Sequence, residues 1–195
     1  MGNDKRDYLR GFGYQGGASR GLWHKEVAEL AFGGDFKDTL SLPADSWSMG
    51  LGGFGEMLPY YENKVYIDHS KKDKWGQPVL AIDCEYKENE AKMREDMMYD
   101  AAEMLEAAGL KDVKPYDNDC YPGMAIHEMG TARMGNDPKT SVLNKWNQMH
   151  EVSNLFVTDG SCMASGACQN PSLTYMALTA RACDYAVKEL KKKNI

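Results

Sequence analysis

The chain has 195 residues, enough for one substantial domain or two small ones with a real apolar core. Its composition is ordinary, 43% hydrophobic and 27% charged, and no apolar run reaches the ~18 residues that a bilayer span requires. The net charge of −6 would repel phosphate backbones, which excludes nucleic acid as an expected partner. We therefore expect a soluble protein and leave open whether it is cytoplasmic or periplasmic.

The five cysteines indicate free thiols. They form neither a CxxC pair nor the Cys/His spacing of a zinc site, so no metal site is expected; they are Cys84, Cys120, Cys162, Cys168 and Cys183. Free thiols suit a reducing compartment. The first residues, MGND, are neither a signal peptide nor an apolar opening element, so we expect that the natural start lies upstream.

Glycine dominates the first part of the chain. Residues 8–21 interleave glycines with aromatic residues, which predicts an irregular loop. The dinucleotide-binding pattern G-x-G-x-x-G is matched formally at 11–16 and again at 50–55. Neither match follows an apolar strand or opens an amphipathic helix, so we do not interpret either as a phosphate-binding loop.

Strand patterns follow between residues 46 and 86. Residues 46–58 alternate large apolar side chains with glycines, which predicts a strand that allows close backbone approach. Residues 65–67 and 78–86 are apolar runs separated by a polar, turn-like stretch and predict a hairpin with a long tip. Because no helix lies between these strands, an antiparallel sheet is expected.

Two helices and one further strand complete the prediction. Residues 89–108 place methionine, leucine and alanine three and four apart, as in a helix packed on a sheet and ended by Gly109. Residues 154–159 predict a short buried strand. Residues 171–190 predict the last helix, with these candidate buried positions: Met176, Ala180, Cys183, Tyr185 and Val187. The expected fold class is α+β, an antiparallel sheet packed against helices.

One histidine stands immediately before a glycine-punctuated segment. His127 opens residues 127–135, and loops on a rigid scaffold often carry function. Taken alone, a single histidine is more often structural. The other three, His24, His69 and His150, have charged or polar neighbours and are weaker candidates for a catalytic base.

A small-residue loop separates Asp159 from the last helix. Asn170 followed by Pro171 is a standard helix start, with asparagine at the N-cap and proline at the first helical position. The free amides at such a start also favour negative charge. The same residues therefore support a structural and a binding interpretation.

Three motifs follow one another in the last third of the chain. They are HEMGT at 127–131 with MG at 134–135, NLFVTDGS at 154–161, and QNPSLT at 169–174 running into ALTARA at 177–182. Together they resemble the C-terminal signature of the glucose-methanol-choline (GMC) oxidoreductases. Residues 56–59, 63–65 and 73–79 are similar to the substrate-domain hairpin of that family. The resemblance covers most of the chain and points to the bacterial sugar and polyol branch.

The resemblance implies an FAD-dependent oxidation of a CH–OH group in a sugar, polyol or other alcohol. His127 matches the general base that accepts the alcohol proton, and Asn170 matches the second catalytic position, which hydrogen-bonds the substrate oxygen. Hydride would pass to flavin N5. The positions implied to bind FAD are Asp159, Gly160, Pro171, Ser172, Leu173 and Thr174.

The family's N-terminal portion, which binds the ADP part of FAD, has no counterpart in this sequence. We therefore predict a substrate-binding domain at 1–115 and a segment at 116–195 that completes the flavin site. The isolated chain should be inactive, should not retain FAD, and should need the missing FAD-binding portion as its partner. Without that partner, self-association would cover exposed apolar surface. The alternative is a non-enzymatic carbohydrate-binding or partner-binding module derived from the substrate domain.

Overall fold

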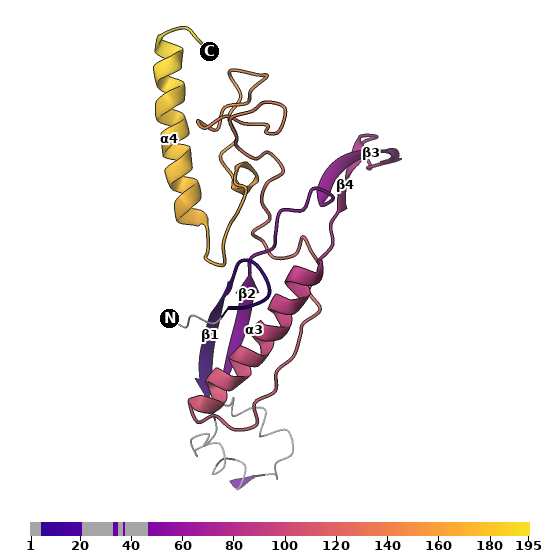
Figure 1. Cartoon of the computed structure of the whole chain (residues 1–195), viewed down its shortest axis with the longest axis vertical. Helices are drawn as coiled ribbons and strands as arrows, with labels where there is room; N and C mark the ends of the chain where they lie inside the picture. The colour runs from indigo at the N-terminus through magenta and orange to yellow at the C-terminus, as the bar shows by residue number, and fades with distance from the viewer. Residues whose placement is uncertain (1–4, 21–32, 35–36, 38–46) are drawn as a thin grey trace. The chain divides into compact units, whose positions relative to one another are not determined.

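Both helices and strands are present in residues 5–20, 33–34, 37 and 47–195, the part of the chain that a computed structural model describes (Figure 1). Contacts divide the chain into one unit made of Met1–Gly13 and Gly55–Ile195 and a second unit, Tyr14–Phe54. The division predicted at residue 115 stays a prediction. No helix in the described ranges is both long and apolar enough to cross a lipid bilayer.

The glycine-rich start of the chain contains a strand, so the loop predicted for residues 8–21 is wrong. Strand β1, Phe12–Arg20, pairs with β2, Trp47–Gly55. At Gly16 a β-carbon would lie 2.4 Å from the Gly50 carbonyl oxygen, so only glycine fits between the paired backbones. Both G-x-G-x-x-G matches lie largely in these strands, which confirms that neither opens a helix.

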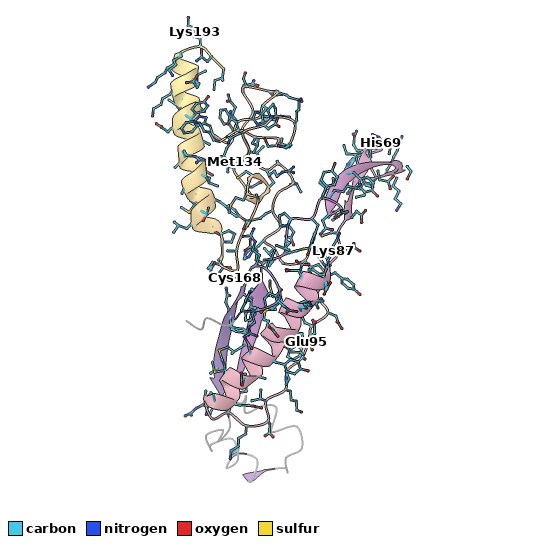
Figure 2. All side chains as sticks on the ribbon, in the orientation of Figure 1. His69, Lys87, Glu95, Met134, Cys168 and Lys193 are labelled. Atoms are coloured by element: carbon cyan, nitrogen blue, oxygen red, sulfur yellow. The ribbon has the colours of Figure 1, made fainter. Side chains whose placement is uncertain are left out.

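The predicted hairpin is confirmed. Strand β3, Lys64–Lys72, pairs antiparallel with β4, Pro78–Asp83, with Lys64 opposite Asp83 and an irregularity between Asp68 and Lys72. The predicted sheet is therefore two separate two-stranded sheets in the described residues. His69 is exposed on β3 (Figure 2).

Helix α3, Glu88–Ala107, agrees with the prediction to within one residue at each end. At its start the Glu90 carboxylate accepts a hydrogen bond from the Lys87 backbone N–H at 3.0 Å, and Gly109, at φ +89°, follows its end. Met93 is buried against Gly55, whose β-carbon would lie 2.7 Å from the methionine sulfur. Met104, also expected on the packed face, is exposed.

Helix α4, Ser172–Lys191, begins after a turn through Pro171, which occupies the N-cap position with φ −92° and ψ 0°. The expectation that Asn170 caps this helix is therefore wrong. No side chain provides the cap. Inner residues of α4 pack on the 144–157 segment, where Tyr185 stacks on Trp146 with ring centroids 4.9 Å apart.

The opposite face of α4 is exposed and apolar. Its large side chains recur three and four residues apart, at exposed fractions of 79% for Leu173, 68% for Met176, 50% for Val187 and 62% for Leu190. Ala180 and Cys183, which continue this spacing, are exposed as well. We call these six residues the α4 stripe. Four of the five positions predicted to be buried belong to it, so that prediction is wrong for all but half-buried Tyr185.

The strand predicted at 154–159 is reduced to an isolated bridge between Gln148 and Phe156. A ladder needs a continuous neighbouring strand, and this segment has none among the described residues. It is held by single contacts instead: Val157 donates to the Asn147 carbonyl, and the Asn147 amide donates to the Val157 carbonyl, both at 3.0 Å. Leu143, Asn147 and Cys162 form the fully buried centre beside it.

Candidate functional site

The first and second motifs run alongside one another through backbone hydrogen bonds. Ala132 N–H donates to the Ser161 carbonyl at 3.0 Å, and Met134 N–H donates to the Cys162 carbonyl at 2.9 Å. Cys162 is buried, and burial raises the pKa of its thiol. Segments about thirty residues apart in sequence are thus joined into one structural element.

The two motifs also approach each other closely at Gly160. A β-carbon there would lie 2.7 Å from the Tyr175 hydroxyl and 3.1 Å from the Glu128 carbonyl oxygen, so any other residue would force these groups apart. Burial raises the pKa of the Tyr175 hydroxyl, and the nearby charges of Cys162, Asp159 and Glu128 act in the same direction. Gly160 therefore fixes the distance between the His127 segment and helix α4.

Asp159 organises the turn that follows it. Its carboxylate accepts hydrogen bonds from the Ser161 backbone N–H, at 2.8 Å, and from the Ser161 hydroxyl. A short 3-10 turn, Gly160–Cys162, begins at this cap. The structure thus gives Asp159 a local role that keeps the predicted FAD-contacting residues 159 and 160 in one conformation.

His127 lies half-buried in the loop before this contact. Its neighbour Glu128 accepts a hydrogen bond from the Ala125 N–H at 2.8 Å. Within the described part of the chain no hydrogen bond engages the His127 ring, and none joins it to Asn170. The structure joins the His127 motif to residues 161 and 162, and the catalytic pairing of His127 with Asn170 stays a prediction.

Asn170 and residues 172–174 are exposed at the start of α4, while Pro171 is buried. The first amides of a helix have no acceptor within the helix, and no acidic side chain stands in this first turn. Such a group of free N–H donors fits the negatively charged pyrimidine side of a reduced flavin. The donor chemistry predicted for Ser172, Leu173 and Thr174 is therefore available.

A second connection ties the loop before α4 to the N-terminal part of the same unit. The Ser165 hydroxyl donates to the Glu56 carboxylate, and Glu56 N–H donates to the Gly11 carbonyl at 3.1 Å. Cys168, labelled in Figure 2, lies against Gly13, where a β-carbon would be 3.2 Å from the sulfur. These contacts connect the small-residue loop before α4 to residues near the N-terminus, in addition to its connection with the His127 segment.

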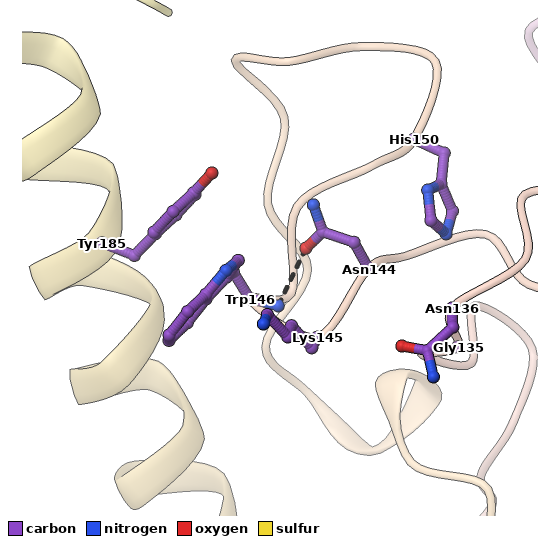
Figure 3. Close-up of a pocket in the computed structure, with 7 residues that line it drawn as sticks. All are labelled: Gly135, Asn136, Asn144, Lys145, Trp146, His150 and Tyr185. Carbon is purple, nitrogen blue, oxygen red and sulfur yellow. Dashed lines mark hydrogen bonds between the residues drawn. The ribbon is translucent and has the colours of Figure 1, made fainter. Parts of the chain in front are cut away.

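A pocket of about 320 Å³ lies between α4 and the turn at 144–150 (Figure 3). Trp146 and Tyr185 stand parallel in it, and Asn144 holds the turn by accepting a hydrogen bond from Trp146 N–H at 2.8 Å. His150 lines it, bonded to the Ser141 hydroxyl at 3.1 Å. Because neither His127 nor Asn170 lines this pocket, it is distinct from the predicted site. His24 lies outside the described residues.

The sequence analysis assigned no role to two residues of the site, Glu128 and Tyr175. Glu128 belongs to the first motif, and Tyr175 follows the third, but their importance depends on the approach at Gly160. A helical residue four positions after Pro171 lies one turn above it, which is the only sequence signal for Tyr175. Glu128 stands three residues after Ala125, a spacing that lets a side chain close a turn on a backbone amide.

Comparison with known proteins identifies the family to which this chain is related. The family model for GMC oxidoreductases matches residues 59–179. The chain is 41% identical over 135 residues to 2-methyl-1,2-propanediol dehydrogenase of Mycolicibacterium austroafricanum, covering 68% of this chain and 24% of the relative. It is 32% identical over 140 residues to the fructose dehydrogenase large subunit of Gluconobacter japonicus, covering 70% and 25%. A solved structure, pyridoxine 4-oxidase from Mesorbium loti, matches at 24% identity and a TM-score of 0.42, covering 76% of this chain and 31% of that one.

The chain belongs to the GMC oxidoreductase family. The resemblance inferred from the three motifs is thereby confirmed, including its sugar and polyol branch. Members of this family are FAD-dependent oxidoreductases that act on alcohols and sugars. The chain spans about a quarter of the length of the curated relatives it matches.

Proposed function

We propose that this chain carries the catalytic part of an FAD-dependent enzyme that oxidises a CH–OH group of a sugar, polyol or other alcohol. The observation that carries the proposal is the pair of backbone hydrogen bonds from Ala132 and Met134 to Ser161 and Cys162. They hold the His127 motif against the segment that leads to Asn170. Membership of the GMC family supports the reaction class.

His127 is proposed as the general base. Oxidation of an alcohol requires removal of the hydroxyl proton, and the free nitrogen of a neutral imidazole can accept that proton. The ring is half-buried and makes no hydrogen bond with another described residue, which leaves a nitrogen for the substrate hydroxyl. Asn170 is proposed to hydrogen-bond the same oxygen, because its neutral amide both donates and accepts.

FAD, when bound, would accept the hydride at N5 from the carbon that loses it. The residues proposed to contact it are Asp159, Gly160 and the start of α4, Pro171, Ser172, Leu173 and Thr174. The N–H groups of residues 172–174, which have no acceptor within the helix, would stabilise negative charge on the ring. Asp159 and Gly160 would define the wall of the site, since the turn they begin is fixed by the hydrogen bonds to Ser161.

The α4 stripe is proposed as the surface that packs on the flavin-binding portion of the enzyme. It begins at Leu173, one of the residues proposed to contact FAD, so the apolar face and the cofactor site are continuous. Six exposed apolar positions on one helix face form a contiguous patch of the kind that marks interaction sites. Without that portion the chain is expected to be inactive, to retain no FAD, and to self-associate through the stripe.

The test uses the chain combined with the flavin-binding portion of a relative, by co-expression or as one polypeptide. The combined protein should be yellow and should reduce its flavin with a sugar or polyol. His127→Ala should slow flavin reduction by about 100-fold or more. The chain alone should emerge colourless from gel filtration after mixing with FAD. A near-normal rate for His127→Ala would remove this residue from the mechanism, and stoichiometric FAD on the chain alone would contradict the need for a partner.

A further inference from the structure

The loop that carries His127 contains an unusual backbone conformation. Ile126 has φ +71°, in the left-handed region that β-branched residues rarely adopt. Its side chain is 90% exposed, so packing does not hold it there. Left-handed conformations of this kind persist only where surrounding contacts impose them, and they cluster at functional sites.

One hydrogen bond closes this part of the loop. The Glu128 carboxylate accepts a hydrogen bond from the Ala125 N–H at 2.8 Å. This bond closes a turn that contains Ile126 and His127. No other hydrogen bond reaches residues 125–127 within the described part of the chain. The conformation of Ile126, and with it the direction in which His127 leaves the backbone, therefore depends on the Glu128 side chain.

The main chain of Glu128 is fixed by a different contact. Its carbonyl oxygen lies against Gly160, which also borders the Tyr175 hydroxyl of α4. The backbone of residue 128 thus sits on the well-connected part of the site, while its side chain reaches back to Ala125. Glu128 therefore links the contact at Gly160, through its backbone, to residue 125, through its side chain.

We propose that Glu128 is a positioning residue for His127: its carboxylate closes the 125–128 turn and orients the imidazole toward the substrate. This inference rests on the proposed function. It assigns Glu128 no contact with substrate or cofactor. The hydrogen-bond acceptor is what matters, not the charge, because the donor is a neutral backbone amide.

The first experiment measures amide hydrogen exchange in the 195-residue chain, with no cofactor present. Glu128→Ala should speed exchange of the Ala125 amide by about 10-fold or more, since its acceptor is lost. Glu128→Gln keeps an acceptor oxygen and should leave that exchange close to the original rate. Glu103→Ala, an exposed carboxylate on α3, is the control and should change nothing. Unchanged Ala125 exchange in Glu128→Ala would overturn the proposal.

The second experiment measures turnover in the protein combined with the flavin-binding portion. Glu128→Ala should lower kcat by about 10- to 100-fold with KM within about threefold, as expected for a misplaced base. Glu128→Gln should restore most of kcat with an unchanged pH profile. Ile126→Gly removes the cost of the left-handed conformation, so adding Glu128→Ala to it should have a smaller effect than in the parent chain.

The outcomes separate the two proposals. A normal rate in His127→Ala would remove the proposed function, whatever Glu128 does to Ala125 exchange. A slow His127→Ala with a normal Glu128→Ala would remove only the positioning role. A Glu128→Gln that is as slow as Glu128→Ala, with a shifted pH profile, would also overturn the inference, because the charge and not the acceptor would then be required.

Discussion

Helices α3 and α4 have the same length, 20 residues each, yet different chemistry holds them. Helix α3 is tied by ions and polar groups. Arg6 pairs with Asp96 at 2.6 Å and with Asp100 at 2.9 Å. Glu90, only 3% exposed, accepts hydrogen bonds from Leu58 and other neighbours. Met93 is the one large apolar side chain of α3 that is buried among the described residues.

Helix α4 is held by packing and a stacked aromatic pair. Ala182 is buried on its inner face, and Tyr185 lies parallel to Trp146. Arg181 donates to the Asn147 side-chain oxygen at 3.1 Å. The stability contributed by the attachment of α3 should therefore depend on pH. The stability contributed by the attachment of α4 should instead depend on the size and charge of its inner-face residues. Helix α4 also has a second apolar face for which the described residues provide no cover.

The largest expected effect distinguishes the two faces of α4. Ala182→Asp places an unpaired carboxylate in a buried position and should lower the free energy of unfolding by about 3 kcal/mol or more. Ala180→Asp makes the same change on the α4 stripe, and we expect about 0.5 kcal/mol there. Urea unfolding followed by far-UV circular dichroism measures both. Equal losses would mean that the faces are not distinct.

Glu90 tests the polar attachment of α3. Burial raises the pKa of its carboxyl, but hydrogen bonds from Leu58 N–H, Lys87 N–H, Tyr60 and Asn89 outweigh burial, so the pKa in the folded protein lies below its usual range. A depressed folded-state pKa contributes stability above the unfolded-state pKa, and the contribution is lost as pH falls through the folded value.

Glu90→Gln should therefore cost about 1 to 2 kcal/mol at pH 7. The difference from the parent chain should shrink once the pH drops below about 4.5, where the unfolded-state carboxyl becomes protonated. Unfolding free energies between pH 3 and pH 7 provide the measurement. Glu103→Gln, on the exposed side of α3, is the matched control. A pH-independent difference would show that the charge of Glu90 is not stabilising.

The smallest effect on stability is expected on the α4 stripe. Met176→Glu combined with Val187→Lys should change the free energy of unfolding by only about 0.5 kcal/mol, because both side chains are largely exposed. The same pair should reduce self-association of the chain, measured by sedimentation velocity. Thr174→Glu adds a charge beside the stripe and should leave self-association unchanged. Persistent association in the double variant would place the contact elsewhere.

Local patterns predicted the elements that local physics forms. The three- and four-residue spacing around Met93 and the glycine at 109 were sufficient for α3, and the apolar runs around the Asp73 turn were sufficient for β3 and β4. Strand β1 was missed because its glycines favour a loop when considered alone. Its pairing with β2 brings Gly16 against Gly50, a residue that no local window around Gly16 includes.

The site was predictable in composition but not in geometry. The motifs identified His127 and Asn170, and their joint role stays a prediction. The contributions of Glu128 and Tyr175 depend on how closely three segments approach at Gly160, which is a property of tertiary packing. Four positions of the α4 stripe were predicted to be buried, and that face of the helix is exposed in the structure. Whether that face is covered depends on a surface outside the described residues, which no pattern in α4 can specify.

Cys183 gives the α4 stripe a natural chemical label. It is an exposed free thiol in the middle of the stripe, while Cys162 is buried and its thiol pKa is raised. Alkylating reagents at neutral pH should consequently modify Cys183 well before Cys162. The rate of that modification then reports directly on whether a binding protein occupies the helix, with no engineered probe required.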